Sequence, residues 1–347
     1  MRKVPVVDKN QRPLMPTSNW RANKLIASGR ALRRFKAGIF YIQLVDRVGG
    51  VVQDIAVGID PGSKREGFTV KSENCTYANV LVSSVDWVKD AVETRKNMRR
   101  ARRYRNTPYR KCRWNRSIGS LPPSTKARWQ TKLRVLDILA KLYPIKFVVV
   151  EDIKAVTKGQ KRWDKSFSPL ETGKKWFYEE IEKRGYQLDL KQGWETKELR
   201  DSMHLTKTKK KLEDCFEAHN VDSWVLANWK VGGHTKPDNT NLIKLIPLQF
   251  HRRQLHVLNF SKGGIRKNHG GTISMGLKRG SLVKHKKYGI TYIGGTSKGK
   301  VSLHDIKSGN RVTQGAFLKD LIVLCFNYWR TLIHPLPKGR SFISVNA

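Results

Sequence analysis

The sequence predicts an α/β protein with a mixed central sheet, because strand-like and helix-like patterns alternate along residues 51–229. Residues 54–60 (DIAVGID) alternate apolar and small side chains and are followed by Pro-Gly, as expected for a strand that ends in a turn. Residues 67–71 and 77–84 continue this strand as an antiparallel meander. The continuous apolar run 147–150 is typical of a central strand covered on both faces.

Apolar spacing predicts helices at 126–143, 171–184 and 214–229. The last is predicted to be one helix that stops at Gly232 and Gly233. After about residue 230, glycine and basic residues become frequent and short strand-like pieces recur. This change predicts a small β-rich C-terminal domain, barrel-like in form.

Residues 1–50 predict a small basic module at the other end of the chain. Strands are expected at 4–7 and 38–45, with the segment Pro13 to Pro16 (PLMP) as a rigid turn.

The formal net charge of +41 is the dominant feature of the composition. Self-repulsion on this scale disfavours a compact chain, which indicates that a polyanion belongs to the working particle. Nucleic acid is the first candidate, because lysine and arginine release condensed counterions when they bind phosphates. A basic structural protein of ribosome type is the alternative that charge alone leaves open.

Other classes are disfavoured by what the sequence lacks. The four cysteines form no Cys-x-x-Cys pair, so neither a zinc knuckle nor a disulfide framework is predicted. No run of eighteen apolar residues and no signal peptide is present, so we expect no membrane partner. We therefore expect a cytoplasmic protein that acts at the prokaryotic nucleoid.

One stretch of the chain is basic without any balancing acid. No Asp or Glu occurs from Thr94 to Leu136, and the part before Pro108 has neither Gly nor Pro and is predicted to be helical. A solvated helix face normally mixes both signs through i,i+4 pairs, which is impossible here, so we expect this stretch to bind nucleic acid. The expected phosphate-binding residues are Arg95, Lys96, Arg99, Arg100, Arg102, Arg103, Arg105, Arg110, Lys111 and Arg113.

Acidic residues at strand ends call for an explanation in so basic a chain. Asp60 and Glu151 each end a predicted strand, although one such carboxylate alone is often only a solvated strand end. His219 and Asp222 stand at i,i+3 and are expected to share one face of the helix 214–229. Carboxylates from two strands and a helix can converge on a divalent ion, and oxygen ligands favour magnesium or manganese over zinc. Asp152 points to the opposite face of the strand from Glu151, so only one of these two can be a ligand.

These acids lie in segments that resemble a known nuclease family. Asp60 with its turn, Glu151 in VVVED and the HNVD of His219 to Asp222 resemble the three split motifs of RuvC-like nucleases, whose core is RNase H-like. The arginine-rich helix between the first two motifs resembles the bridge helix of the RNA-guided members. These members are the type II CRISPR effector nucleases and their transposon relatives IscB, IsrB and TnpB.

Further motifs resemble IscB and IsrB in particular. The PLMP segment, preceded by Val7-Asp8-Lys9, resembles their N-terminal module, and residues 251–256 with 262–266 resemble their C-terminal region. IscB has an HNH nuclease between its second and third motifs, but here the interval 152–217 is too short and has no paired His/Asn hairpin. TnpB has a zinc-binding cysteine cluster near its third motif, where this chain has only Cys215. Both absences favour the IsrB family.

The resemblance implies a domain order. It consists of a PLMP module (1–50), RuvC-like core part I (51–85), an arginine-rich bridge helix (86–118), core parts II and III without an HNH insertion (119–229), and a β-rich C-terminal domain (230–347) that binds RNA and the target-adjacent motif.

The resemblance also implies a function. Asp60, Glu151 and Asp222 would hold two Mg²⁺ ions, with Mn²⁺ able to replace them, and His219 would orient or deprotonate the attacking water. The partners would be an omega-type guide RNA, one protein per RNA, and double-stranded target DNA with a short flanking motif. The activity implied is a nick in the displaced non-target strand. Two alternatives stay open: a guide-independent, structure-selective RuvC-like DNA nuclease, and a non-catalytic RNA-binding protein of the mobile element.

Overall fold

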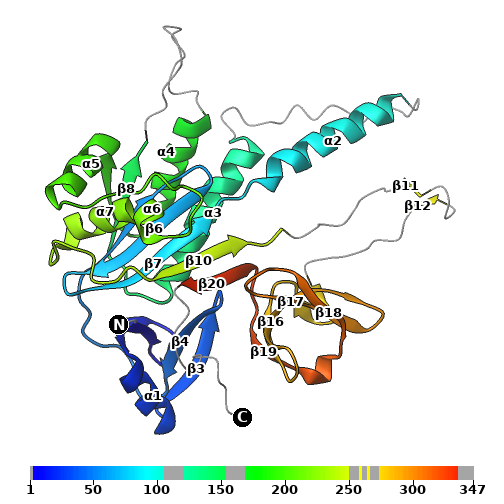
Figure 1. The fold of residues 1–347 in the computed structure, drawn as a ribbon, viewed down its shortest axis with the longest axis horizontal. Coiled ribbons are helices and arrows are strands. Elements are labelled where there is room, and N and C mark those ends of the chain that lie inside the picture. Colours follow the sequence, from blue (N-terminus) through cyan, green and yellow to red (C-terminus); the bar gives the residue numbers. More distant parts are fainter. Residues whose placement is uncertain are drawn as a thin grey trace.

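A computed structural model shows a mixed α/β protein with three larger sheets. The structure describes residues 3–104, 121–153, 169–249, 258–259, 264–265 and 273–334. In Figure 1 a central sheet carries helices on both faces, while a blue N-terminal sheet and an orange C-terminal sheet lie to one side of it. Within these ranges, no helix is long and apolar enough to cross a membrane.

The central sheet has seven strands in the order β20-β10-β7-β6-β5-β8-β9. Strands β5, β6 and β7 form the antiparallel meander that the sequence predicts, and β8 and β9 follow parallel to β5. Strand β10 runs parallel to β7, and β20 closes the edge antiparallel to β10. The strands are β5 (Ile55–Asp60), β6 (Arg65–Ser72), β7 (Cys75–Ser83), β8 (Phe147–Asp152), β9 (Gln187–Gln192), β10 (Leu242–Pro247) and β20 (Trp329–His334).

Side-chain alternation divides the core of this sheet into two layers. Val57 and Ile59 of β5 belong to the larger hydrophobic cluster, which includes Leu136 of α3 and Phe177 of α4. On the opposite face, Trp224 of α7 packs in a second cluster. The helices are α3 (Pro123–Ala140), α4 (Pro169–Glu182), α5 (Gly193–Ser202), α6 (Phe216–His219) and α7 (Val221–Val231). Asp60 and Glu151 alternate with the residues of the larger cluster and therefore lie on the α7 face.

Two glycines allow α7 to lie directly on the sheet. A Cβ atom added at Gly58 of β5 would lie 1.9 Å from the carbonyl oxygen of Ser223. A Cβ atom at Gly67 of β6 would lie 2.1 Å from the carbonyl oxygen of His219, the last residue of α6, and 3.1 Å from Ser223 Oγ of α7. Because Gly67 pairs with Asp60 in the register of β5 and β6, this close approach brings the start of α7 next to Asp60.

Both ends of α7 are tied to the sheet by buried polar side chains. At the N-terminal end, the Asn220 amide donates hydrogen bonds to the carbonyls of Phe68 (3.1 Å) and Val80 (3.2 Å). At the C-terminal end, the fully buried Lys71 donates to the carbonyl of Gly232 (2.5 Å), and its burial lowers the pKa of this lysine to about 8. These contacts set the axial position of the helix.

The N-terminal module is a four-stranded sheet in the order β2-β1-β4-β3 with its own small core. The PLMP segment, expected as a turn, is instead part of strand β2, and Leu14 pairs with Val6 of β1. Strand β2 lies at the edge of the sheet, where prolines that lack an N–H group are tolerated. The elements are β1 (Lys3–Val7), β2 (Pro13–Ser18), α1 (Asn19–Ala27), β3 (Ala31–Lys36) and β4 (Ile39–Leu44).

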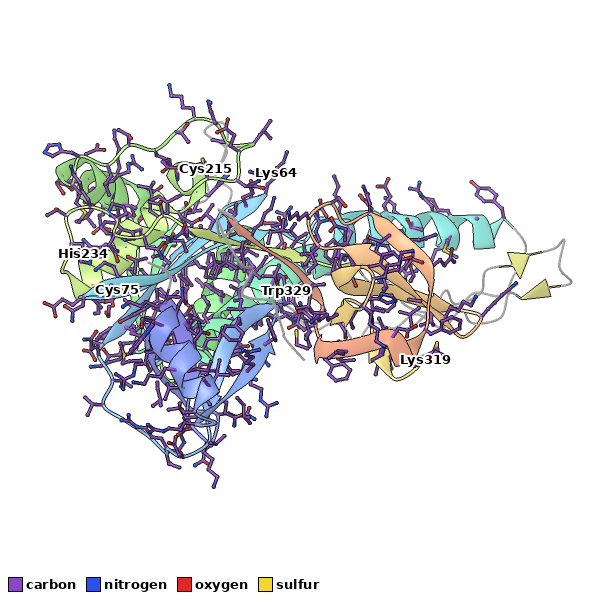
Figure 2. The ribbon with its side chains drawn as sticks, turned by 60° about the horizontal axis from the view of Figure 1, so that its bottom comes forward. Lys64, Cys75, Cys215, His234, Lys319 and Trp329 are labelled. Carbon is purple, nitrogen blue, oxygen red and sulfur yellow. The ribbon has the colours of Figure 1, made fainter. Side chains whose placement is uncertain are left out.

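The C-terminal part contains the predicted β-rich unit, a five-stranded antiparallel sheet in the order β18-β17-β16-β15-β19. The central sheet nevertheless continues beyond residue 229, because β10 and β20 pair with it on either side of this unit in the sequence. Figure 2 labels Trp329, the buried first residue of β20, near the middle of the molecule. The remaining elements are β11 (Leu258–Asn259), β12 (Gly264–Ile265), β13 (Ile273–Ser274), β14 (Leu277–Lys278), β15 (Leu282–His285), β16 (Gly289–Ser297), β17 (Lys300–Asp305), β18 (Arg311–Ala316), η3 (Leu318–Asp320) and β19 (Leu321–Cys325).

The long helix α2 (Trp87–Arg103) follows β7 and extends away from the central sheet (Figure 1). The sequence predicts this helix from the absence of Gly and Pro before Pro108. It connects the meander to the part of the chain that leads to α3.

We predict that Gly58→Ala lowers the free energy of unfolding by about 1–3 kcal/mol, because the added methyl group would overlap the backbone of α7. Gly315→Ala is the matched control, since the nearest atom to its Cβ would be Thr313 Oγ1 at 4.0 Å. Chemical denaturation of the two variants and the wild type measures the difference. Equal stability of all three proteins would contradict the direct contact between α7 and β5.

Candidate metal centre

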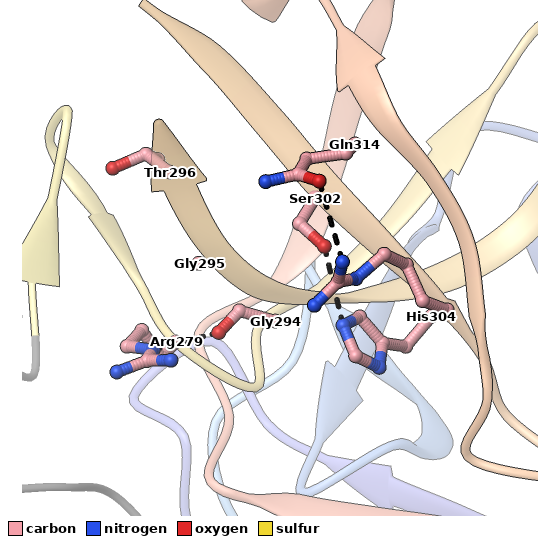
Figure 3. Close-up of a pocket in the computed structure, with 8 residues that line it drawn as sticks. Arg279, Gly294, Gly295, Thr296, Ser302, His304 and Gln314 are labelled. Atoms are coloured by element: carbon pink, nitrogen blue, oxygen red, sulfur yellow. Dashed lines mark hydrogen bonds between the residues drawn. The ribbon is translucent and has the colours of Figure 1, made fainter. Parts of the chain in front are cut away.

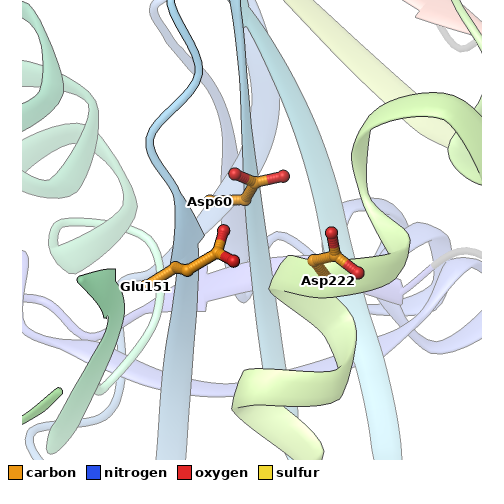
Figure 4. Close-up of side chains that lie close together, drawn as sticks. All are labelled: Asp60, Glu151 and Asp222. Atoms are coloured by element: carbon orange, nitrogen blue, oxygen red, sulfur yellow. The ribbon is translucent and has the colours of Figure 1, made fainter. Parts of the chain in front are cut away.

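Three carboxylates from separate parts of the sequence converge at the carboxyl ends of two interior strands of the central sheet. Asp60 is the last residue of β5, Glu151 lies near the end of the adjacent parallel strand β8, and Asp222 lies in the first turn of α7. One oxygen of each carboxylate lies within 4.8 Å of the others. Figure 4 shows the three side chains pointing toward one another. The structure therefore brings together the three acids that the sequence singles out.

Burial and mutual repulsion make this cluster a site for positive charge. Burial, followed by the negative charges of Asp60 and Asp222, raises the pKa of Glu151 from 4.5 to about 8. A divalent cation would remove this repulsion, and carboxylate oxygens are the ligands that Mg²⁺ and Mn²⁺ prefer. The residues present therefore fit a divalent-metal site.

Two basic side chains already contact the cluster. Arg200 of α5 donates from Nη1 to Asp222 Oδ1 at 2.7 Å. Lys207 lies in the segment between α5 and α6, and its Nζ contacts Asp60 Oδ2 at 3.4 Å and also Asp222 Oδ2. Burial lowers the pKa of Lys207, but the charges of Asp60 and Asp222 outweigh this effect and raise it above its ordinary value. Lys207 is therefore a cation at neutral pH.

Asp152 lies on the other face of β8, as strand alternation predicts. Its Oδ1 accepts hydrogen bonds from Lys174 (2.6 Å) and Tyr178 (2.9 Å) of α4, and its Oδ2 accepts one from Gln192 (2.9 Å). These donors lower the pKa of Asp152 despite its burial. The network fixes the end of β8 and thereby the backbone that carries Glu151.

The position of His219 differs from the prediction. The expected single helix 214–229 is two helices, because Asn220 caps both α6 and α7 and its amide binds the sheet. His219 is thus the last residue of α6 and does not share a helix with Asp222. Its Nε2 contacts the carbonyl oxygen of Glu213 (3.0 Å) and Arg65 Nη1 (3.3 Å). Burial and the positive charge of Arg65 lower the pKa of His219, which keeps its ring neutral at pH 7.

The sequence patterns do not predict the two basic residues at the cluster or the helix that carries one of them. The apolar spacing of residues 193–202 does not predict a helix, although α5 is stabilised by a capping box between Gln192 and Glu195. The available signal for Lys207 was the basic run of 207–211 (KTKKK), which precedes the third acidic motif.

The arginine-rich stretch is described only in part. Arg95, Lys96, Arg99 and Arg100 are exposed on α2. Arg102 and Arg103 belong to the same helix by their backbone. The predicted phosphate-binding residues Arg105, Arg110, Lys111 and Arg113 lie outside the described residues, as do 251–256 of the C-terminal resemblance.

A second polar site is an open cavity of about 260 Å³ in the C-terminal sheet (Figure 3). Its charged side chains are basic: Arg279 donates to the carbonyl of Gly294 at 2.7 Å, and Arg311 donates to Gln314 Oε1 at 3.3 Å. The remaining lining residues are Gly295, Thr296, Ser302 and His304. No acidic residue lines this cavity within the described part of the chain.

Comparison with known proteins gives two similarities. Residues 4–162, less than half of the chain, match the family model described as RRXRR protein. This range includes the sequence Arg-Arg-Ala-Arg-Arg at 99–103. No curated protein matches the chain. Among solved structures, T. thermophilus RuvC in complex with Holliday junction substrate is 13% identical with a TM-score of 0.29, covering 52% of this chain and 98% of that one.

We predict that the metal-free protein loses stability relative to Glu151→Gln as the pH rises from 4.5 to about 8. Over this range the carboxylate ionises in the unfolded chain while it stays protonated in the folded protein, so folding becomes less favourable. For the same reason Mn²⁺ should bind the wild type more tightly as the pH rises to about 8, because binding must displace the Glu151 proton and this becomes easier as the pH approaches the pKa.

Thermal unfolding in chelator and Mn²⁺ titration, each across this pH range, measure the two effects. Glu198→Gln, an exposed position on α5, is the control and should follow the wild type. Parallel stability curves for the wild type and Glu151→Gln would contradict the raised pKa.

Proposed function

We propose that this protein is an RNA-guided DNA endonuclease of the IsrB type that nicks the displaced strand of its target. The observation that carries the proposal is the convergence of Asp60, Glu151 and Asp222 within 4.8 Å in a chain with a net charge of +41. A carboxylate cluster for divalent ions inside a protein built to bind polyanions is the combination that phosphodiester cleavage requires.

The order of the central strands supports a RuvC-like, RNase H-like core. An antiparallel meander of β7, β6 and β5 is followed by the parallel strands β8 and β9, and the acids lie at the ends of β5 and β8. Helix α7 then supplies the third acid from the face on which the first two lie. This arrangement matches the split-motif pattern on which the resemblance rests.

In the proposed reaction the protein positions a scissile phosphate beside the three carboxylates. Asp60, Glu151 and Asp222 would hold two Mg²⁺ ions, which when bound supply an activated water and stabilise charge at the phosphate. His219, neutral at pH 7, would orient the attacking water or accept a proton from it. The ring must first move, because its Nε2 contacts the Glu213 carbonyl. Asp152 holds the β8 end in place through its three hydrogen bonds and takes no ligand role.

Guide-RNA binding is supported by the arginine-rich helix. The RRXRR model, which is found in IscB- and IsrB-type proteins, covers this helix together with the N-terminal module and the first two acidic motifs. The exposed side chains of Arg95, Arg99 and Arg100 can neutralise phosphates of a guide RNA or of its hybrid with the target strand. We propose residues 86–118 as the bridge helix, 1–50 as the PLMP module, and 51–85 with 119–229 as the core. Strands β10 and β20 extend the sheet of this core on the β7 side, and β20 forms its edge.

Recognition of the flanking motif is proposed for the β-rich C-terminal part. The cavity of Figure 3 supports this assignment, because Arg279 and Arg311 can bind guanine O6 and N7 or a phosphate, and Gln314 can pair with adenine. A lining without acids among the described residues suits the electron-rich edges of bases and the phosphates of DNA.

The proposed strand preference rests on the one acidic cluster found in the described residues and on the lack of an HNH motif in the sequence. The interval between the second and third motifs contains α4, β9 and α5 in its described part, and its sequence has no HNH motif. The displaced strand is single-stranded and flexible, whereas the target strand is held in an RNA–DNA duplex. We therefore propose a nick in the displaced strand.

The decisive test is Asp60→Ala in the protein purified with RNA from its own locus. We expect Mg²⁺-dependent cleavage to fall at least about 100-fold, because a metal site contributes several kcal/mol to such a reaction. RNA-directed DNA binding should stay nearly unchanged. Asp54→Ala is the matched control, since this acid immediately before the same strand is exposed and pairs only with Lys146 in the described residues.

The substrate is a supercoiled plasmid with the target, followed by an end-labelled duplex. Nicked circles with only the displaced strand cut support the proposal. Cutting without the RNA would favour a guide-independent nuclease, and RNA binding without any cutting would favour a non-catalytic RNA-binding protein.

We further predict that changing Arg99, Arg100, Arg102 and Arg103 to Ala weakens RNA binding and flattens its salt dependence by about one unit of slope per lost phosphate contact. Binding measured between low and high salt gives the slope. Lys183→Ala is the control, because this exposed lysine pairs with Glu180 on α4. An unchanged salt-dependence slope in the quadruple variant would indicate that α2 is an ordinary solvated helix that does not bind RNA phosphates.

A further inference from the structure

Lys207 contacts two of the carboxylates that a metal ion would need, so the two cations would compete for them. Its Nζ bridges Asp60 and Asp222, which come from β5 and α7 and are two of the three carboxylates of the cluster. Arg200 holds the other oxygen of Asp222. Lys207 is thus the cation that connects two proposed metal ligands, while Arg200 supports one of them.

Lys207 is better able to leave the cluster than Arg200. The Arg200 side chain is 17% exposed, projects from a regular helix and lies near Asp201 as well as Asp222. The Lys207 side chain is 33% exposed and stands on an irregular segment. Its ammonium group is a point charge on a flexible four-carbon stem, which can move to another anion at little cost.

The segment around Lys207 offers a route toward an incoming strand. Lys209, Lys210 and Lys211 follow within four residues and are exposed. The end of the segment is anchored, because Asp214 pairs with Arg65 at 2.9 Å and also with Lys244. A nucleic-acid strand that reaches the carboxylates would therefore meet a basic segment whose far end is fixed to the core.

We propose that Lys207 is a positioning residue that makes metal binding depend on the arrival of the DNA strand. Without DNA, Lys207 neutralises Asp60 and Asp222 and competes with divalent ions for them. A strand phosphate offers Lys207 a second anion, so that Lys207 turns to the phosphate and leaves the carboxylates to the metal. This inference rests on the proposed nuclease function and adds that the arrival of DNA determines when the site binds its metal ions.

Metal occupancy is tested by local oxidative cleavage of the polypeptide, which requires no DNA cutting. The full-length protein with its bound RNA is treated with ascorbate, peroxide and Fe²⁺ at a concentration too low to saturate the site, so that the half-point reports Mg²⁺ affinity. Cleavage next to residues 60, 151 and 222 is quantified as Mg²⁺ is added in competition. Lys207→Ala should lower the Mg²⁺ concentration for half-maximal protection by about tenfold, because a contacting positive charge is removed. Lys207→Arg keeps the charge and should resemble the wild type.

A second arm adds single-stranded DNA. The DNA should lower the half-protection concentration in the wild type toward that of Lys207→Ala and should leave that of Lys207→Ala unchanged. Lys209→Ala, an exposed lysine of the same segment, is the matched control and should behave as the wild type.

Equal Mg²⁺ half-points for the wild type and Lys207→Ala, or an equal response of both to DNA, would overturn the proposal. If Lys207→Ala is not folded, equal half-points for the wild type and Lys207→Gln would overturn it instead. Failure of the nuclease function itself would show separately, as wild-type protein that does not cut the target DNA, and failure of the assigned site as Asp60→Ala protein that still cuts it.

Discussion

The direct contact of α7 with β5 and β6 is the constraint on which the rest of the site depends. Gly58 leaves no side chain between the sheet and the backbone of α7, and Gly67 leaves none between the sheet and the end of α6 at His219, so Asp222 reaches the carboxylates of two strands. Asn220 and Lys71 then hold the two ends of α7 by hydrogen bonds to backbone carbonyls. A larger residue at either glycine would move the third acid away from the first two.

Concentrating negative charge at this point has an electrostatic cost that the chain offsets locally. The high pKa of Glu151 shows that the cluster resists carrying all three negative charges. Lys207 and Arg200 balance part of this charge, and both come from the interval between the second and third acidic motifs. The same interval supplies Gln192, which helps to orient Asp152 on the opposite face of β8. A segment without a nuclease insertion therefore still shapes the site.

The prediction of one helix from 214 to 229 shows where periodicity misleads. The apolar spacing continues across Asn220, but its amide is buried and donates to strands β6 and β7, which separates α6 from α7. His219 is therefore turned toward Glu213 and Arg65, and its proposed role requires a rearrangement. The PLMP segment shows the complementary case, because an edge strand tolerates prolines that would disrupt a central one.

The sequence by itself determined the α/β class, the meander, the buried strand β8 and the three acids, because alternation and strand-end position are local properties of the chain. Strand alternation also determined that the side chains of Glu151 and Asp152 lie on opposite faces of β8. Only the tertiary structure decided that β10 and β20 complete the central sheet, that α5 exists beside the site, and that Lys207 and Arg200 meet the carboxylates. A capping box and a basic run mark α5 and Lys207 locally. What these residues and strands β10 and β20 contact depends on segments far apart in the sequence, and no local pattern indicates that.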